Sequence, residues 1–544
     1  MPVAVEHLIN AAAESGLIEA AIVPELRVKA RRERSDLLEV IASYGRFPVS
    51  AFYRALAAQR GLRYIDFAII DPPTELVRRL PESLARRRLI FPLLQENGEI
   101  LIVTADPDDR QSLDAVQRIV GIPAKLAVSD PDTLKTAIDS AFRDKHTAAH
   151  IEPARASIDA VELFDRIMKE AFLCRASDIH LEPAEQGLVV RLRIDGRLQC
   201  CLANLGTESG ASLLSRIKVL AGLDIAEQRA PQDGGFSYQL PLTASKKIDI
   251  RVATISTRWG ERATLRLLGT ETQDLTLESL GMSHQNLEQF RKVIQRPYGM
   301  ILLTGPTGSG KSTTLYAALC EINRPHINIM TVEDPIEYSI TGISQVQISG
   351  GEKMNFAKAL RALLRHDPDV LMVGEIRDAE TADIAMKAAM TGHLVFSTLH
   401  TNSACAAVTR LTDIGCEPFL IGSTLAAAIA QRLVRRLCSL CKKPRTITPE
   451  EAALLGVGGD EGINLYEPVG CAYCLGTGYR GRIALFETLW IDQPLARLIS
   501  SGTTEAEIRS ACKGFTTLLS DGCDKARAGL VTLDEVMTAV IQEV

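Results

Sequence analysis

Residues 305–312 read Gly305-Pro306-Thr307-Gly308-Ser309-Gly310-Lys311-Ser312, which is a glycine, four residues, a glycine, a lysine and a serine. This spacing is the phosphate-loop pattern, in which backbone N–H groups converge on phosphate oxygens. The apolar run at 299–304 predicts a buried strand before the loop, and residues 312–319 predict a helix after it. The N-terminus of a helix adds a favourable dipole for the same phosphates. We favour this interpretation over a glycine-rich surface turn and predict a nucleoside triphosphate site.

Two side chains of the loop have predicted roles of their own. Lys311 would reach the β- and γ-phosphates, and the hydroxyl of Ser312 would ligate Mg²⁺. The expected cofactors at this site are therefore ATP and Mg²⁺. The residues predicted to bind the nucleotide are Gly305, Pro306, Thr307, Gly308, Ser309, Gly310, Lys311, Ser312 and Thr313.

Length and composition limit the class of protein. With 544 residues the chain is too long for one hydrophobic core, and three to five domains are expected. A formal net charge of -6 gives no electrostatic reason to expect nucleic acid as the main partner, although a local basic face remains open. The N-terminus lacks signal-peptide features, and no apolar run approaches the ~20 residues of a spanning helix. We expect a cytoplasmic protein that reaches a membrane only through partners.

Changes of pattern along the chain predict six segments. Residues 1 to about 60 have helical apolar spacing, and a small α/β unit follows from Tyr64. The predicted segments are an N-terminal domain (1–145), a linker (146–157), a second domain (158–272), a nucleotide-binding domain (284–430), a four-cysteine module (431–485) and a C-terminal helical domain (486–544).

The second domain is predicted to be built around a hairpin with an Asp195-Gly196 turn. A later turn is expected at 231–235, followed by strands at 248–252 and 261–267. In these two strands the arginines alternate with apolar residues, so they lie on one face of the sheet. Spacing alone favours a solvated sheet face over a functional one.

Three predicted strands of the nucleotide-binding domain run into ionisable residues. The strand at 327–332 precedes Glu333, the strand at 370–373 precedes Glu375, and the strand at 394–399 precedes His400. In an open α/β sheet the carboxyl edge is where ligands bind. Acids there suit Mg²⁺ coordination and water activation beside a triphosphate, and a histidine suits sensing of the γ-phosphate.

Four of the twelve cysteines form two C-x-x-C pairs, 438–441 and 471–474. Four thiolates suit a closed tetrahedral Zn²⁺ site with no labile position, so the expected role is structural. A thioredoxin-like redox use of one pair is the alternative, although no surrounding pattern favours it. The predicted zinc ligands are Cys438, Cys441, Cys471 and Cys474.

With these residues in view, the chain resembles the type II secretion and type IV pilus assembly ATPases, the traffic ATPases. The resemblance covers residues from about 158 to the C-terminus and rests on four boxes and on the segment 175–183, which resembles the start of the family's second domain. It implies an α/β multidomain fold: a RecA-like P-loop ATPase core, a preceding PAS-like α/β domain, an N-terminal helical and α/β domain and a tetracysteine zinc module. The four boxes are the phosphate loop, 331–337, 365–378 and 391–402.

The resemblance also implies roles at the sheet edge. Glu333 stands where the family has a general base that aligns the attacking water. Glu375 stands where the family has an acid serving Mg²⁺ through water, with Gly374 where many other NTPases have aspartate. His393 and His400 match the histidine box, and by parity they lie on opposite strand faces, so only one need touch phosphate.

Two arginines of the second domain gain a role from the resemblance. Arg251 and Arg266 match arginines that the family supplies across a subunit interface, which replaces the solvated-face interpretation. A cation there would stabilise transition-state charge, as an arginine finger does. The family works as a hexameric ring, so a homohexamer is expected, peripheral to the inner membrane.

The N-terminal domain is expected to dock a partner: the inner-membrane platform and its cytoplasmic adaptor. Some family members bind cyclic di-GMP through Arg-Leu-Gly motifs, and no clear equivalent precedes Tyr64, so no such site is expected.

The resemblance predicts an ATP hydrolase that powers type II secretion by driving pseudopilus assembly. A type IV pilus assembly motor is the nearest alternative. A RecA-like nucleic-acid motor is the alternative from another class, disfavoured by net charge and few aromatics. A non-hydrolysing scaffold is disfavoured because Glu333 and Glu375 are both present.

Overall fold

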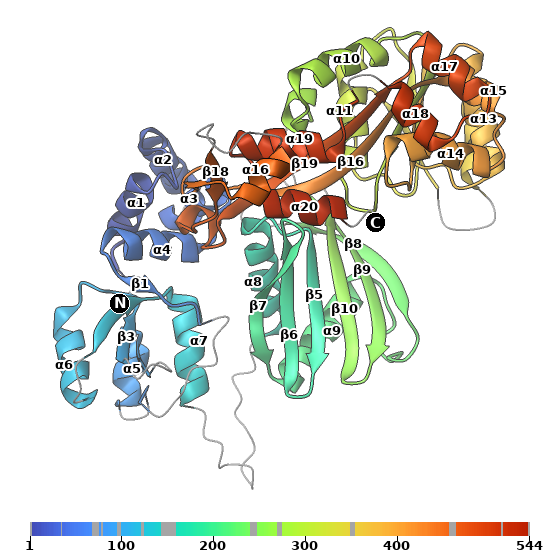
Figure 1. Ribbon diagram of the computed structural model, residues 1–544. Helices are drawn as coiled ribbons and strands as arrows, with labels where there is room; N and C mark the ends of the chain where they lie inside the picture. Colours follow the sequence, from blue (N-terminus) through green and yellow to red (C-terminus); the bar gives the residue numbers. More distant parts are fainter. Residues whose placement is uncertain are drawn as a thin grey trace. The chain divides into compact units, whose positions relative to one another are not determined.

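The computed structural model, drawn in Figure 1, divides into two compact units. Unit 1 is Met1–Glu271 with Cys438–Cys441 and Val469–Arg480, and unit 2 is Thr272–Leu437 with Lys442–Pro468 and Gly481–Val544. The structure describes residues 3–33, 35–67, 76–77, 80–94, 100–120, 124–142, 159–239, 247–268, 275–348, 354–455, 464–512 and 515–541. The predicted linker at 146–157 lies outside these residues.

Unit 1 begins with four α-helices, as the apolar spacing predicts. The N-cap Asp36 accepts hydrogen bonds from the amides of Leu38 and Glu39 and so fixes the start of the third helix. The helices are α1 (Val5–Glu14), α2 (Val23–Glu33), α3 (Leu37–Gly45) and α4 (Val49–Gln59), with a short 3-10 turn at Ala20–Ile22.

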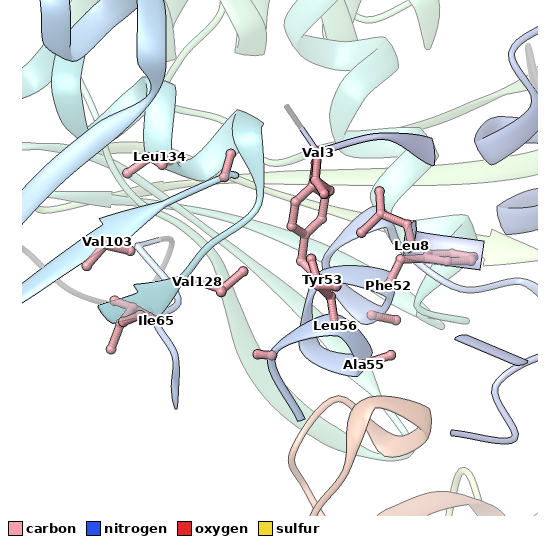
Figure 2. Packing of buried hydrophobic residues seen from close by; sticks show 14 of the residues in the cluster. Val3, Leu8, Phe52, Tyr53, Ala55, Leu56, Ile65, Val103, Val128 and Leu134 are labelled. Carbon is pink, nitrogen blue, oxygen red and sulfur yellow. The ribbon is translucent and has the colours of Figure 1, made fainter. Parts of the chain in front are cut away.

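A small α/β layer shares its core with these helices. Phe52 and Leu56 of α4 belong to the same buried cluster as Val103 and Val128 of the sheet (Figure 2). The sheet order is β1-β4-β3-β2, in which β2 and β3 are antiparallel and the other pairs parallel. The elements are β1 (Arg63–Tyr64), α5 (Glu82–Arg88), β2 (Ile90–Leu94), β3 (Ile100–Thr104), α6 (Arg110–Val120), β4 (Lys125–Val128) and α7 (Pro131–Ala141).

The second part of unit 1 is a six-stranded antiparallel sheet in the order β7-β6-β5-β10-β9-β8. Alternate residues such as Ile179 and Leu181 pack in one core with two helices, while the residues between them face the other side. The predicted hairpin is confirmed, with positive φ at both Asp195 and Gly196. The elements are α8 (Ala160–Leu173), β5 (Asp178–Ala184), β6 (Gly187–Ile194), β7 (Arg197–Leu205), α9 (Thr207–Leu220), β8 (Gln232–Gln239), β9 (Lys247–Thr257) and β10 (Gly260–Leu268).

The prediction of a turn at 231–235 is wrong, because residues 232–239 form strand β8. A Cβ on Gly234 would lie 2.5 Å from the carbonyl oxygen of Ala221, just after α9. The glycine therefore allows a close backbone approach within a strand rather than a chain reversal.

Unit 2 is organised around a seven-stranded sheet in the order β13-β12-β14-β15-β11-β16-β19. The pairs from β13 through β16 are parallel, so their carboxyl ends meet at one edge. The strands are β11 (Gly299–Thr304), β12 (Ile329–Glu333), β13 (Ser344–Gln347), β14 (Val370–Val373), β15 (Leu394–Leu399), β16 (Leu425–Leu437) and β19 (Tyr479–Trp490).

Helices cover both faces of this sheet. Leu302 belongs to one buried cluster that includes helical residues, whereas its neighbours Ile301 and Leu303 belong to a second such cluster. This alternation explains why β11 is apolar throughout, as expected for a strand buried on both faces. The first cluster contains α12 (Phe356–Leu363), α13 (Ala379–Met390) and α14 (Ala404–Asp413), and the second contains α10 (His284–Ile294) and α11 (Lys311–Ile322).

The remaining elements, all but one of them in unit 2, are shorter. The segment predicted to be helical from 486 begins inside β19, and four helices follow that strand. The elements are the 3-10 turns Leu277–Leu280 and Ala472–Cys474 (η4, in unit 1), α15 (Pro418–Thr424), β17 (Lys443–Thr446), α16 (Pro449–Leu455), β18 (Asn464–Glu467), α17 (Gln493–Ser500), α18 (Glu505–Ala511), α19 (Leu518–Arg527) and α20 (Leu533–Ile541).

The α/β multidomain fold class with a parallel phosphate-loop core is confirmed. The six-segment division stays a prediction, and β16 and β19 run through its boundaries at 430 and 485. Among the described helices, none is long and apolar enough to cross a bilayer.

Candidate functional site

The phosphate loop connects β11 to the N-terminus of α11, as the sequence predicts. Gly305 has φ 141°, and a Cβ there would lie 2.5 Å from the carbonyl oxygen of Gln431, so no other residue fits without displacement. The hydroxyl of Ser309 is buried and has no hydrogen-bond partner among the described residues. A buried donor without a partner, in a loop of backbone amides, fits a phosphate oxygen.

Lys311 is folded back on the loop itself. Its Nζ donates to the carbonyl oxygens of Gly305 at 2.7 Å and of Pro306 at 3.1 Å. Burial lowers the pKa of Lys311 to about 8, while the charge of Glu375 acts to raise it. Two neutral carbonyls offset only part of the cost of burying the charged ammonium. A triphosphate, being negatively charged, would therefore stabilise the charged form of Lys311.

Strand β16 brings two residues to the loop that the sequence analysis missed. Gln431 accepts a hydrogen bond from Thr314 of α11 at 2.8 Å, and the Arg432 guanidinium donates to Asn402 at 3.2 Å. Both are nearly fully buried. Their position follows from the pairing of β16 with β11, which no local spacing reveals.

The predicted edge of ionisable residues is assembled by hydrogen bonds between strand ends. The amide of Gly374 donates to Val332 at 2.8 Å, which sets Glu333 beside the end of β14. The hydroxyl of Thr398 donates to the carbonyl of Gly374 at 2.7 Å, and the amide of Thr401 donates to the hydroxyl of Thr304 at 2.9 Å. The ends of β12, β14, β15 and β11 are therefore tied together.

Glu333 is buried, with 3% of its surface exposed, and three side chains donate to it. Oε1 accepts from Thr331 at 2.5 Å and from Gln345 at 3.0 Å, and Oε2 accepts from the hydroxyl of Tyr316. Neither Tyr316 nor Gln345 was predicted. Each is distant in sequence from Glu333.

Glu375 lies between two cationic or ionisable groups. Its Oε1 is 2.5 Å from the guanidinium of Arg377, and its Oε2 is 3.4 Å from Nε2 of His400. The structure thus brings Glu375 and His400 together as the strand-end argument predicts. His393, by contrast, precedes β15 at its amino end and contacts the carbonyl of Ala388, so it lies away from this edge.

Arg251 and Arg266 lie opposite each other on β9 and β10 of unit 1. Both are exposed on the same sheet face, as the alternation predicts. The Nε of Arg266 donates to Asp178 at 3.0 Å while 64% of its side chain remains exposed.

The four predicted cysteines form one cluster in unit 1. Their sulfur atoms all lie within 4.8 Å of one another, and three of the pairs are 3.7 to 3.8 Å apart. A tetrahedral Zn²⁺ site with Zn–S bonds of about 2.3 Å has S–S edges of about 3.8 Å. Backbone amides of Gly470, Cys471 and Gly478 donate to these sulfurs, which is favourable for thiolates. The cluster therefore fits a zinc ion.

Two family models match the chain. The model described as "Type II/IV secretion system protein" matches residues 155–538, and the model described as "MshEN domain" matches residues 60–148. The first match covers more than half of the chain.

Curated relatives match nearly the whole chain. A type II secretion system ATPase E from Vibrio cholerae is 49% identical, covering 87% of this chain and 98% of the relative. A type II secretion system protein E from Dickeya dadantii is 42% identical, covering 86% and 98%. The type IV pilus assembly ATPase PilB of Thermus thermophilus is 39% identical over 94% of this chain, which spans only 60% of that longer protein.

Among solved structures, the ATPase DotB of Legionella pneumophila has the same fold, with a TM-score of 0.53. It is 23% identical and covers 72% of this chain and 98% of its own. Together with the phosphate loop and the acids at the sheet edge, these matches identify the chain as an ATP hydrolase that belongs to the type II/IV secretion system protein family.

Proposed function

We propose that this chain hydrolyses ATP to power type II protein secretion by driving pseudopilus assembly. The observation that carries the proposal is one sheet edge with a phosphate loop, a buried Glu333 and a Glu375–His400 pair, in a chain 49% identical to a type II secretion ATPase. The family match favours this function over a nucleic-acid motor or a non-hydrolysing scaffold.

Each residue at the edge has a proposed task. Lys311 binds the β- and γ-phosphates and Ser312 ligates Mg²⁺, because both lie where the loop meets α11. Glu333 acts as the general base that aligns the attacking water, and the side chains that donate to it hold its carboxylate in one orientation. Glu375 serves Mg²⁺ through water, and His400 beside it senses the γ-phosphate.

The active site is proposed to be shared in a homohexamer. Arg251 and Arg266 are paired and exposed on a sheet face of unit 1, where a neighbouring subunit's nucleotide would meet them. Their guanidinium groups would then stabilise charge in the transition state, which is the role of arginine fingers.

The cysteine cluster is proposed to hold a structural Zn²⁺, with no position left for a labile ligand. The sulfur spacing favours four-thiolate coordination over redox use of one pair. The N-terminal domain is proposed to dock the inner-membrane platform and its cytoplasmic adaptor. The protein would then be cytoplasmic and peripheral to that membrane, with no nucleic-acid partner and no cyclic-dinucleotide site.

Assembly of a type IV pilus is the second candidate, because the PilB relative matches 94% of this chain. Type II secretion is favoured because the secretion relative is more similar and is covered almost completely.

Complementation of a gene deletion tests this proposal. The deletion strain would receive the wild-type chain, the Lys311→Ala variant or the Lys387→Ala variant. Lys387→Ala is the control, because it replaces an exposed lysine on α13. Secreted enzyme in the medium and surface pili would be measured together. We expect the wild type and Lys387→Ala to restore secretion and Lys311→Ala to leave it lost, with pili unchanged. Loss of pili with normal secretion would favour the second candidate, and no change in either would refute both.

A further inference from the structure

One buried tyrosine links the phosphate-loop helix to the proposed general base. Tyr316 lies on α11, four residues after Ser312, and only 1% of its surface is exposed. Its hydroxyl donates to Oε2 of Glu333 and accepts from the amide of Glu337 at 3.2 Å. The hydroxyl therefore uses both its donor and an acceptor position, and its orientation is fixed.

The ring of Tyr316 is held as firmly as its hydroxyl. It packs edge-on against Tyr338, with ring centroids 5.5 Å apart and planes at 89°. The carbonyl of Tyr338 accepts from Gln345 at 2.9 Å, and Gln345 also donates to Oε1 of Glu333. One connected set of contacts thus orients both oxygens of the carboxylate.

We propose that Tyr316 is a positioning residue for ATP hydrolysis, acting through Glu333. The hydrogen bond from Tyr316 to one oxygen fixes the orientation of the Glu333 carboxylate. Its remaining lone pairs then point in one direction, and the alignment of an attacking water requires such a fixed acceptor. Because α11 begins with Lys311 and Ser312, Tyr316 also fixes Glu333 relative to the bound triphosphate. This inference rests on the proposed function, in which Glu333 is the base.

Tyr316→Phe tests the proposal, since it removes only the hydroxyl and keeps the ring packed. We expect kcat to fall about tenfold or more, with the dissociation constant for ATP within about twofold of wild type, because the hydroxyl bonds to Glu333 and Glu337, neither of which is in the phosphate loop. The matched control is Thr488→Val, which removes another buried hydroxyl of unit 2 that donates to Asn286. We expect the control to turn over at the wild-type rate.

A double variant separates positioning from general loss of structure. In single-turnover assays, Tyr316→Phe should cause little further loss, under about twofold, when added to Glu333→Gln, because the group it orients is already replaced. A Tyr316→Phe variant that turns over like wild type would overturn the inference. So would an equal fall in the wild-type and Glu333→Gln backgrounds, since that result means a structural role.

Two further outcomes distinguish failure of Glu333 as the general base from failure of Tyr316 as its positioning residue. If Glu333→Gln itself hydrolyses ATP at the wild-type rate, the proposed base fails and the inference fails with it. If Glu333→Gln is slow and Tyr316→Phe is not, only the inference fails. Should Tyr316→Phe not fold, Gln345→Leu on the edge strand β13 removes a donor from the same carboxylate. It should show the same fall in kcat with unchanged ATP affinity, and a wild-type kcat there would overturn the proposed orienting network.

Discussion

Replacing Arg480 with alanine should loosen the contact between the cysteine cluster and the N-terminal helices of unit 1. The Arg480 guanidinium lies 4.3 Å from the ring centres of both Phe47 and Tyr473. It also donates to the carbonyl of Tyr473 at 2.8 Å. Phe47 lies between α3 and α4, whereas Tyr473 lies in η4 between two of the cysteines. Arg480 therefore connects two segments that are distant in the chain.

The contacts give the size of the expected effect. A desolvated cation–π contact contributes up to about 2 kcal/mol. A hydrogen bond from a charged group contributes about 1.5 to 3 kcal/mol. Burial lowers the pKa of Arg480, which reflects an opposing cost of removing the charge from water. A net loss of about 2 to 3 kcal/mol is expected, and it corresponds to roughly a 30- to 140-fold change in a local opening equilibrium.

Hydrogen–deuterium exchange of the α4 amides measures that opening directly. Arg480→Ala should speed their exchange by this factor, and Arg480→Lys should recover little because an ammonium lacks the planar stacking surface. The control is Arg60→Ala at the end of α4, whose ion pair with Asp108 is exposed, so less than about a fivefold change is expected. Unchanged α4 exchange in Arg480→Ala would refute the reasoning.

Two further predictions concern the metal and the shared site. Elemental analysis should find one zinc per chain, and Cys438→Ser should destabilise the cysteine cluster but leave ATP binding intact. Freshly purified protein that contains no zinc would contradict the assignment. Arg266→Ala and Lys311→Ala chains, each inactive alone, should recover partial ATPase activity when mixed under conditions shown to exchange subunits. No recovery there would count against a site shared between subunits.

The sequence predicts the phosphate-loop region closely because its signals are local. The apolar run at 299–304 forms β11 with the same bounds, and the helix predicted at 312–319 is α11, which begins one residue earlier, at Lys311. The ends of β14 and β15 were also predicted, since each strand is a short, mostly apolar run that ends just before Gly374-Glu375 or His400. Parallel pairing then brings Glu375 and His400 together without further information.

Other features depend on contacts that no spacing encodes. Tyr316 reads as an apolar residue of α11, and its hydroxyl finds Glu333 only because β12 lies beside that helix. Gln345 reaches the same carboxylate through the pairing of β13 with β12. The glycines at 234 and 235 resemble a turn in sequence, yet the close approach of α9 and β9 requires them inside a strand.

The most direct test of the central claim is single-turnover hydrolysis of ATP by Glu333→Gln. This substitution keeps the size of the side chain and a hydrogen-bonding group but removes the basic oxygen. We expect ATP to bind with near wild-type affinity and the hydrolysis rate to fall on the order of 10² or more, the usual scale for losing general-base assistance. Hydrolysis at the wild-type rate would contradict the account.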